Sequence, residues 1–567
     1  MSGPGDRASK QKSSGEPTQS NHAEGHGRGP TRVGVDSRQS PGSKSSARAQ
    51  QASAREPGDL DEARPVVVSG RQAREGKPQS AASVEKSDEV VVPAKSAKTR
   101  VTPVEPMEGR TEAKGKSVAR NASSTLSEPD ALSFLQRIGE RAKQKPEEKW
   151  TNLLSHMRLP LLKEAYQRLR RNAAAGVDQV TWAEYGERLD ERLFDLQGRV
   201  HRGSYHPQPV KRVFIPKGDG KLRPLGIPAL EDKIVQQAAV MMLTPIYEAE
   251  FVGISYGFRP GRSQHDALDA LAVAIERKVS WVLDADIEAF FDTIDHRHLQ
   301  AFIEHRIGDT RMVRLLMKWA KSGVMVDGKR HETDAGTPQG GLISPLLANL
   351  YLHYVLDLWV LSWRKKHASG AMYVVRYADD FVMGFQKEQD AMAMREALAQ
   401  RLEHFGLKLH PQKTRVIEFG RYARERRAGR GLANPETFDF LGFTHIAGIS
   451  RDGRFQLQRR TSRKKRRAKL ARIKEESERR RHYPVKAQHD WICSVLNGHC
   501  RYYAVPTNYR ALTQFRYAVD WIWRRSLQRR SQRARWNKAQ HEAFTQRFPL
   551  PEPRILHPWP RNRFALR

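Results

Sequence analysis

The chain has 567 residues, and its 99 Lys and Arg outnumber its 64 Asp and Glu to give a formal net charge of +35. This excess of positive charge is typical of proteins that bind a polyanion, and nucleic acid is the usual one. No apolar stretch could span a bilayer and the first fifty residues lack the apolar run of a secretory signal, so we expect no membrane association. The only cysteines, Cys493 and Cys500, exclude a disulfide framework and a four-cysteine zinc site, and they predict thiols in a reducing cytoplasm.

Residues 1–125 form a segment of unusual composition. They are rich in Ser, Gly, Pro, Ala, Lys, Arg and Glu and contain almost no aromatic residues. Such a segment cannot bury enough apolar surface to offset the entropy lost on ordering, so we predict a disordered basic extension. A second function, as a basic tether for RNA, stays open.

The composition changes at Leu132. Apolar residues between 153 and 166 recur at the spacing of an amphipathic helix, which we expect to end near Gly176. Strand-like and helical segments then alternate to about residue 445. We therefore predict an α+β domain over residues 126–445, followed by a helical, basic domain over residues 446–567.

Two segments combine apolar strands with acidic residues. Residues 281–285 are mostly apolar and run into Asp286, after which we expect a turn and a helix. In the second segment, apolar runs flank Asp379 and Asp380, which predicts a hairpin with both acids at its tip. Adjacent carboxylates between strands are costly to bury without cations nearby.

Two divalent metal ions would account for these acids. Nucleotidyl transfer uses two ions about 3.5–4 Å apart, one at the attacking oxygen and one at the leaving oxygen. Mg²⁺ prefers hard oxygen ligands and is completed by water and substrate phosphates. We predict Asp286 and Asp379 as ligands of two Mg²⁺ ions and Asp380 as the third, supporting catalytic acid. An Asp-Asp pair by itself is more often an ordinary turn, so the surrounding motifs decide the interpretation.

Those motifs carry a family resemblance. Tyr-Ala-Asp-Asp at 377–380, joined to an upstream Asp-x-x-x-x-Phe at 286–291, resembles the active site of reverse transcriptases. Further blocks resemble group II intron-encoded proteins, in family order: Arg-Pro-Leu-Gly-Ile-Pro at 223–228, Tyr-Gly-Phe-Arg-Pro-Gly-Arg-Ser at 256–263, Gly-Thr-Pro-Gln-Gly-Gly at 336–341 and Phe-Asp-Phe-Leu-Gly-Phe at 438–443. A looser match, Leu-Asn-Gly-His-Cys-Arg-Tyr-Tyr at 496–503, is similar to the maturase, or thumb-associated, domain of that family.

The resemblance implies a fold and an activity. The fold would be a right-hand polymerase with fingers and a ferredoxin-like palm over residues 126–445, then an α-helical thumb and maturase domain. The activity would be RNA-directed DNA synthesis from dNTPs on a target DNA primer, with intron RNA as template and as partner in splicing. The chain lacks the cysteines of the HNH nuclease domain found in many relatives, so we expect another primer source, such as a replication fork. A cytoplasmic location, at the nucleoid when bound to DNA, would follow.

The resemblance also implies nucleotide-binding residues. Lys217, Lys221 and Arg223 belong to a Gly-containing turn that would place cations on the triphosphate. Their alternative is a solvated hairpin. Gln339 would lie against the incoming nucleotide, where neighbouring glycines allow close backbone approach, and Lys413 would approach the phosphates during transfer.

Phe291 stands where this family places an aromatic ring beneath the sugar. A ring there would clash with a 2′ hydroxyl, the group by which proteins distinguish RNA from DNA. The resemblance therefore predicts selection of deoxynucleotides. The alternative is a core residue, because either Phe290 or Phe291 must pack inward.

The chain between residues 459 and 481 carries 13 Lys or Arg against three acids. This pattern predicts a solvated helical face, and its residues Arg463, Lys464, Lys465, Arg466 and Arg467 are candidates for binding RNA. Two other functions stay open for the whole chain. One is a reverse transcriptase of retron, diversity-generating or defence-associated lineage, which the full set of blocks disfavours. The other is a non-catalytic RNA-binding splicing factor, which the intact aspartates disfavour.

Overall fold

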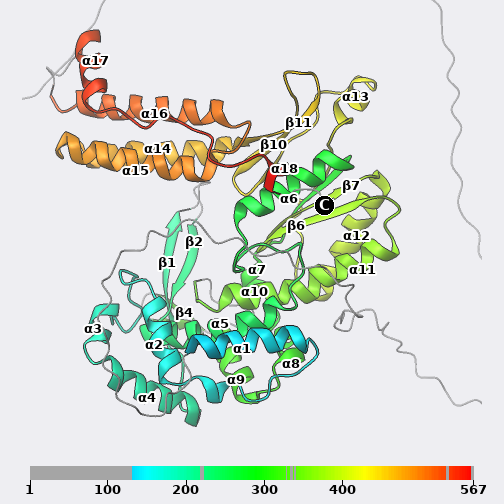
Figure 1. Ribbon diagram of the computed structural model, residues 1–567, viewed down its shortest axis with the longest axis vertical. Helices are drawn as coiled ribbons and strands as arrows, with labels where there is room; N and C mark the ends of the chain where they lie inside the picture. The colour runs from blue at the N-terminus through cyan, green and yellow to red at the C-terminus, as the bar shows by residue number, and fades with distance from the viewer. Residues whose placement is uncertain are drawn as a thin grey trace, which may run out of the picture. The chain divides into compact units, whose positions relative to one another are not determined.

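The computed structural model describes residues 131–216, 222–322, 324–326, 329–331, 336, 340–531 and 536–563 (Figure 1). All of them belong to one unit of the chain, residues 82–567. The predicted disordered extension, residues 1–125, lies outside the described residues.

Helices make up most of the first half of the described chain. They are α1 (Ala131–Gln144), η1 (Leu154–His156), α2 (Leu159–Arg168), α3 (Trp182–Gly186), α4 (Leu189–Arg202), α5 (Leu230–Glu248), α6 (Gln264–Arg277), α7 (Phe290–Thr293), α8 (His296–Arg306) and α9 (Thr310–Ala320). The helix expected over 153–166 forms as the short turn η1 and then α2, which ends at Arg168 rather than near residue 176. Pro160 lies in the first turn of α2, where its fixed φ favours the start of a helix.

A four-stranded antiparallel sheet forms the centre of the fold. Its order is β6 (Met372–Tyr377), β7 (Asp380–Phe385), β3 (Trp281–Asp286) and β8 (Arg415–Glu418). Successive side chains of a strand point to opposite faces. Leu283 and Met383 accordingly pack in one core with residues of α12 (Glu388–His404), while Val282 and Val382 pack in another with residues of α6. Because both faces are covered, most residues of these strands are apolar, and the buried exceptions include Arg376 in β6 and Glu418 in β8.

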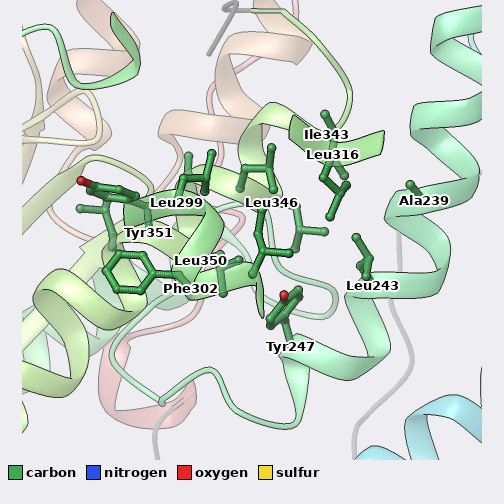
Figure 2. Packing of buried hydrophobic residues seen from close by; sticks show 14 of the residues in the cluster. Ala239, Leu243, Tyr247, Leu299, Phe302, Leu316, Ile343, Leu346, Leu350 and Tyr351 are labelled. Atoms are coloured by element: carbon green, nitrogen blue, oxygen red, sulfur yellow. The ribbon is translucent and has the colours of Figure 1, made fainter. Parts of the chain in front are cut away.

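The larger core extends away from this sheet into helices. Figure 2 shows Leu243 and Tyr247 of α5, Leu299 and Phe302 of α8, and Leu350 of α10 (Ser344–Leu352) meeting in it. Helix α10 is apolar on nearly all its faces, as expected for a helix surrounded by protein. It continues through a π-helical turn, η2 (His353–Asp357), into α11 (Leu358–Lys366).

Two smaller sheets contain strands from the sequence blocks at 223–228 and 438–443. One has the order β2 (Leu222–Ile227), β1 (Val210–Pro216), β4 (Val324–Val326) and β5 (Lys329–His331). The other, which follows the helix α13 (Ala423–Ala428), has the order β11 (Phe455–Thr461), β10 (Phe443–Ile449) and β9 (Phe438–Phe440). Strands therefore continue to Thr461, past the residue 445 where we expected the helical domain to begin. The sequence of β11 does not show the usual alternation of apolar and polar residues. Its inward residue Arg459 is charged, and it is buried and paired with Asp269.

The remaining helices are α14 (Arg463–Arg479), α15 (Val485–Tyr503), α16 (Tyr509–Gln528), α17 (Lys538–Arg547) and α18 (Pro560–Arg563). The first three share a separate core that includes Ile473, Leu496, Phe515 and Trp523. The helix predicted from the basic run over 459–481 is thus α14, and its charged residues face away from this core. Across the part of the chain that the structure describes, no helix is both long and apolar enough to cross a membrane.

Candidate active site

The three predicted aspartates meet where strands of the central sheet end. Asp286 is the last residue of β3 and pairs in register with Asp380, the first residue of β7. Tyr377 pairs with Asp380 across the β6–β7 hairpin, which leaves Ala378 and Asp379 as a two-residue turn. The predicted hairpin with acids at its tip is confirmed. The pairing brings together residues that are 93 positions apart in the sequence.

These aspartates lie in a cleft of about 1550 Å³, which we call the acidic cleft. Two further acids line it, Asp284 and Asp439, and sequence reasoning gave neither of them a role. The signal for Asp284 was available, because residues two apart in a strand point to the same face, and Asp284 is two residues before Asp286. Asp439 could not be placed from the sequence, since it arrives on β9, a strand of another sheet.

Crowding of carboxylates changes the protonation of this site. The pKa of Asp380 is raised to about 7, first by burial and then by the neighbouring charges of Asp379 and Asp286. Burial also raises the pKa of Asp284 to about 6, although a hydrogen bond from Arg415 opposes the change. Like charges held this close disfavour one another's ionised forms, and nearby cations would relieve the repulsion.

Lys413 contributes one such cation. Its ammonium forms an ion pair with the carboxylate of Asp286. The position follows from the backbone, because the amide of His410 donates to the carbonyl of Asp286 at 2.8 Å and the amide of Lys413 donates to the carbonyl of His410 at 3.2 Å. The structure thus brings the predicted lysine to the predicted metal ligand.

The donor set of the acidic cleft suits Mg²⁺. Asp286, Asp379 and Asp380 offer only hard carboxylate oxygens, which this ion prefers. Among the described residues, no three His, Cys, Asp or Glu side chains are arranged as a complete metal-binding group. Magnesium in polymerase sites keeps several waters and binds substrate phosphates, so a few carboxylates that remain open on one side are a sufficient protein contribution.

A second cavity of about 980 Å³, the aromatic cavity, adjoins the hairpin from another direction and shares Asp379 and Asp380 with the acidic cleft. Phe291 lines it and is half-buried, whereas Phe290 is 3% exposed and packs in the large core. Of the two adjacent phenylalanines, the structure therefore directs Phe290 inward. Phe258 also lines this cavity, and its ring lies 6.5 Å from that of Tyr377.

The structure describes few of the predicted nucleotide-binding residues. Outside the described residues lie Lys217, Lys221 and Gln339. Of Arg223 the structure gives only the backbone, which lies in β2 opposite Ile215. Next to Gln339, Gly340 has a φ of +116°, and a side chain there would place its Cβ 2.2 Å from the carbonyl oxygen of Gly226. Gly340 thus lies close to strand β2. The predicted approach of the glycine-rich segment to the incoming nucleotide stays a prediction.

Basic residues also line the acidic cleft, and we call them the basic wall. Arg463, Lys464, Lys465 and Arg466 line it at the start of α14, whereas Arg467 is exposed on the same helix but does not line it. Sequence reasoning missed Arg460 and Arg510, which also line the cleft. Arg460 belongs to the basic run of residues 459–481 but lies on β11, whereas Arg510 lies on α16 and joins the run only through the tertiary fold.

Comparison with known proteins gives a consistent result. The profile of a family described as "Reverse transcriptase (RNA-dependent DNA polymerase)" matches residues 215–445. Protein YkfC of Escherichia coli K12 is 38% identical over 274 residues, which are 42% of this chain and 71% of YkfC. Group II intron-encoded protein LtrA of Lactococcus lactis subsp. cremoris is 38% identical over 240 residues, or 41% of this chain. The match covers 39% of LtrA, so much of that protein's length has no counterpart in the alignment.

A more distant relative carries the word maturase in its name. Nuclear intron maturase 4, mitochondrial, of Arabidopsis thaliana is 24% identical over 211 residues, which are 36% of this chain and 25% of that protein. The matched segment of the family profile contains all three aspartates, Phe291 and Lys413.

Proposed function

The chain belongs to the reverse transcriptase (RNA-dependent DNA polymerase) family, and from this premise we propose that it copies the RNA of a group II intron into DNA and assists the splicing and mobility of that intron. The observation that carries the proposal is the meeting of Asp286, Asp379 and Asp380 in a cleft that basic residues also line. Positive residues beside a cluster of carboxylates suit a nucleic acid, because the positive residues can hold its phosphates while its 3′ end reacts at the carboxylates.

We assign the parts of a right-hand polymerase on the same basis. The central sheet with α6 and α12 would be the ferredoxin-like palm, the β1–β2 hairpin would belong to the fingers, and α14–α16 would be the thumb and maturase region. Lys217 and Lys221 would carry cations to the triphosphate, and Gln339 would contact the incoming nucleotide. Phe291 would lie beneath its sugar.

The chemistry follows from where the charges lie. Asp286 and Asp379 would hold two Mg²⁺ ions and Asp380 would support them. When bound, the ions would stabilise charge on the attacking 3′ oxygen and on the departing pyrophosphate. Lys413, which pairs with Asp286, would exchange that contact for the phosphates of the nucleotide as the cleft fills. Arg463, Lys464 and Lys465 would hold the nucleic acid backbone across the cleft.

A direct assay tests the polymerase function. The purified chain should extend a DNA primer on an RNA template in the presence of dNTPs and Mg²⁺, and addition of EDTA should stop extension. We also expect the protein to increase the splicing rate of the group II intron that encodes it, measured with the precursor RNA in low Mg²⁺. Extension only on DNA templates, or no effect on any intron RNA, would contradict the corresponding half of the proposal.

The basic wall predicts a specific salt dependence. Changing Arg463, Lys464 and Lys465 together to Gln should weaken RNA binding to a similar extent for all sequences, because phosphate contacts carry no sequence information. Each contact to a single strand contributes roughly 0.7 to the slope of log affinity against log salt concentration, so that slope should fall by about two. Filter binding across a salt series measures both quantities.

The matched control removes the same charge elsewhere. Arg137, Lys143 and Lys145 are exposed on or just after α1 and line neither cavity. Their triple change to Gln should leave the slope nearly unchanged. Equal losses in the two triple variants would mean that net charge, and not the wall of the cleft, accounts for RNA binding.

A further inference from the structure

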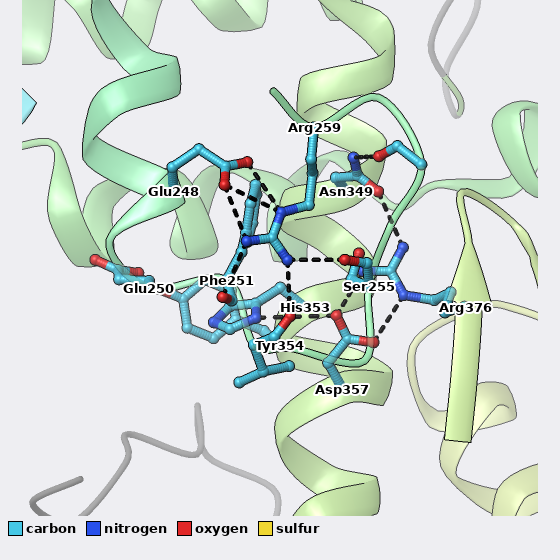
Figure 3. A network of polar contacts seen from close by, with 12 residues as sticks. Glu248, Glu250, Phe251, Ser255, Arg259, Asn349, His353, Tyr354, Asp357 and Arg376 are labelled. Carbon is cyan, nitrogen blue, oxygen red and sulfur yellow. Dashed lines mark hydrogen bonds and ion pairs between the residues drawn. The ribbon is translucent and has the colours of Figure 1, made fainter. Parts of the chain in front are cut away.

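A buried polar network lies beneath the turn that carries Asp379 (Figure 3). Its centre is Arg376, the residue before Tyr377 in β6, and both Arg376 and Asp357 have no exposed surface. The guanidinium donates from Nε to Oδ1 of Asp357 at 2.7 Å and from Nη2 to Oδ2 at 2.5 Å. Such a bidentate pair fixes the plane of the guanidinium as well as its position.

The remaining nitrogen of the guanidinium reaches the hairpin turn itself. Nη1 of Arg376 donates to the carbonyl oxygen of Ala378 at 2.9 Å and to Oδ1 of Asn349 at 2.9 Å. Nδ2 of Asn349 donates in turn to the carbonyl of Gly257 at 2.7 Å. Asp357 and Asn349 therefore orient a side chain that holds the peptide between Ala378 and Asp379.

The turn needs such support because its backbone is strained. Ala378 has a φ of +58°, in the left-handed region that residues with a Cβ avoid. Glycine is the usual residue at the first position of a two-residue turn of this kind. Strained backbone of this sort persists only where the surroundings fix it, and it is found mostly at functional sites.

A neighbouring loop fixes the other side of the same turn. The amide of Tyr256 donates to the carbonyl of Arg376 at 2.9 Å, and the amide of Arg376 donates to the carbonyl of Ile254 at 2.9 Å. A Cβ on Gly257 would lie 2.3 Å from the amide nitrogen of Ala378, so the loop packs directly against the turn. Arg259, 6% exposed, holds the loop by donating to the carbonyls of Val252 and Ser255.

The support itself comes from a helix segment with an extra residue per turn. Asp357 ends the π-helical turn η2, a rare geometry that occurs frequently at functional sites. His353 lies 4.0 Å from Asp357, but burial lowers its pKa to about 4, so a neutral imidazole leaves the carboxylate charge to Arg376. Arg376 and Asp357 thus form a charge pair within the network, with the neutral side chains of Asn349 and His353 beside it.

We propose that Arg376 is a positioning residue for DNA synthesis, which holds the strained turn at Ala378 so that the carboxylate of Asp379 faces the acidic cleft. The proposal rests on the proposed role of Asp379. The loop of residues 256–263 would have a positioning function as well. It would hold the catalytic hairpin, and its arginines would not contact the substrate.

The test compares variants of the full chain that fold. Arg376→Lys keeps the charge but cannot donate to Asp357, Asn349 and Ala378 together, so kcat for primer extension should fall by roughly 100-fold, the effect of a misplacement of about 1 Å. The KM for dNTP should change little. Mn²⁺ binding to the protein–primer–template complex, followed by electron paramagnetic resonance, should weaken in parallel, which a loss of stability alone would not cause.

Arg306→Lys serves as the matched control. Arg306 is 1% exposed, pairs with Glu250 and donates to the carbonyl of Glu148 at 2.7 Å, so its change should lower the melting temperature with kcat retained. If Arg376→Lys loses only stability, as the control does, the proposal is wrong. Should that variant not fold, Asn349→Ala removes one acceptor from Arg376, and the same fall in kcat is expected. If Asp379→Asn retains DNA synthesis, the proposed function itself is refuted. If Asp379→Asn loses DNA synthesis while Arg376→Lys keeps the wild-type kcat, only this inference is refuted.

Discussion

Changing Asp379 and Asp380 together to Ala is expected to abolish DNA synthesis while splicing of the intron RNA survives. Both carboxylates face the acidic cleft, and both would help to hold the ions that stabilise the attacking and leaving oxygens. Several kcal/mol of transition-state stabilisation would disappear, which corresponds to a fall in rate of roughly 1,000-fold or more. The basic residues of α14 that line the cleft remain intact, so RNA binding should persist.

Primer extension and splicing of the same intron, measured with the same protein preparation, check this separation. Glu396 and Glu403 are exposed acids on α12 that line neither cavity, and their double change to Ala should leave both activities unchanged. Burial and then the charges of Asp379 and Asp286 raise the pKa of Asp380, so the double change removes a buried, repelled carboxylate and should not unfold the protein. Splicing lost in parallel with synthesis would mean that the two acids are structural.

Local sequence patterns predict where the three aspartates lie in the strands, and the structure confirms these positions. Their role as metal ligands rests on the surrounding family motifs and stays a prediction. An apolar strand that ends in Asp286 and a hairpin with Asp379 at its tip each follow from strand periodicity and turn chemistry. The fold then needs only one pairing, between β3 and β7, to join them. Asp284 could have been included by the same reasoning, since it shares a strand face with Asp286.

Residues that reach the cleft through tertiary contacts could not be predicted in this way. Asp439 and Arg510 arrive on different elements, and neither lies in a run of similar residues. The ion pair between Lys413 and Asp286 depends on backbone hydrogen bonds that attach the segment after α12 to the end of β3. Buried charges also hide strand patterns. Arg459 in β11 and Arg376 in β6 occupy inward positions, where strand alternation predicts apolar residues. Each is buried and forms an ion pair with an aspartate from another element.

Changing Phe291 to Ala or Val is expected to let the enzyme incorporate ribonucleotides. The side chain is half-buried at the edge of the aromatic cavity, which also contains Asp379 and Asp380, while its neighbour Phe290 takes the core position. A ring so placed would exclude a 2′ hydroxyl by contact, and its removal would open the space that this hydroxyl needs. Shape contacts of this size contribute roughly 10- to 200-fold to specificity, so discrimination against ribonucleotides should fall by a factor in that range.

Single-nucleotide extension with matched dNTP and rNTP series gives the ratio of the two kcat/KM values, in which a general loss of activity cancels. Phe290→Leu is the matched control, because it shortens the adjacent ring within the core and should reduce stability without altering that ratio. The effect should be larger for Phe291→Ala than for Phe291→Val, because valine retains part of the volume beneath the sugar. A ratio unchanged in both variants would mean that Phe291 packs like Phe290 and that deoxynucleotides are selected by another group in the cavity.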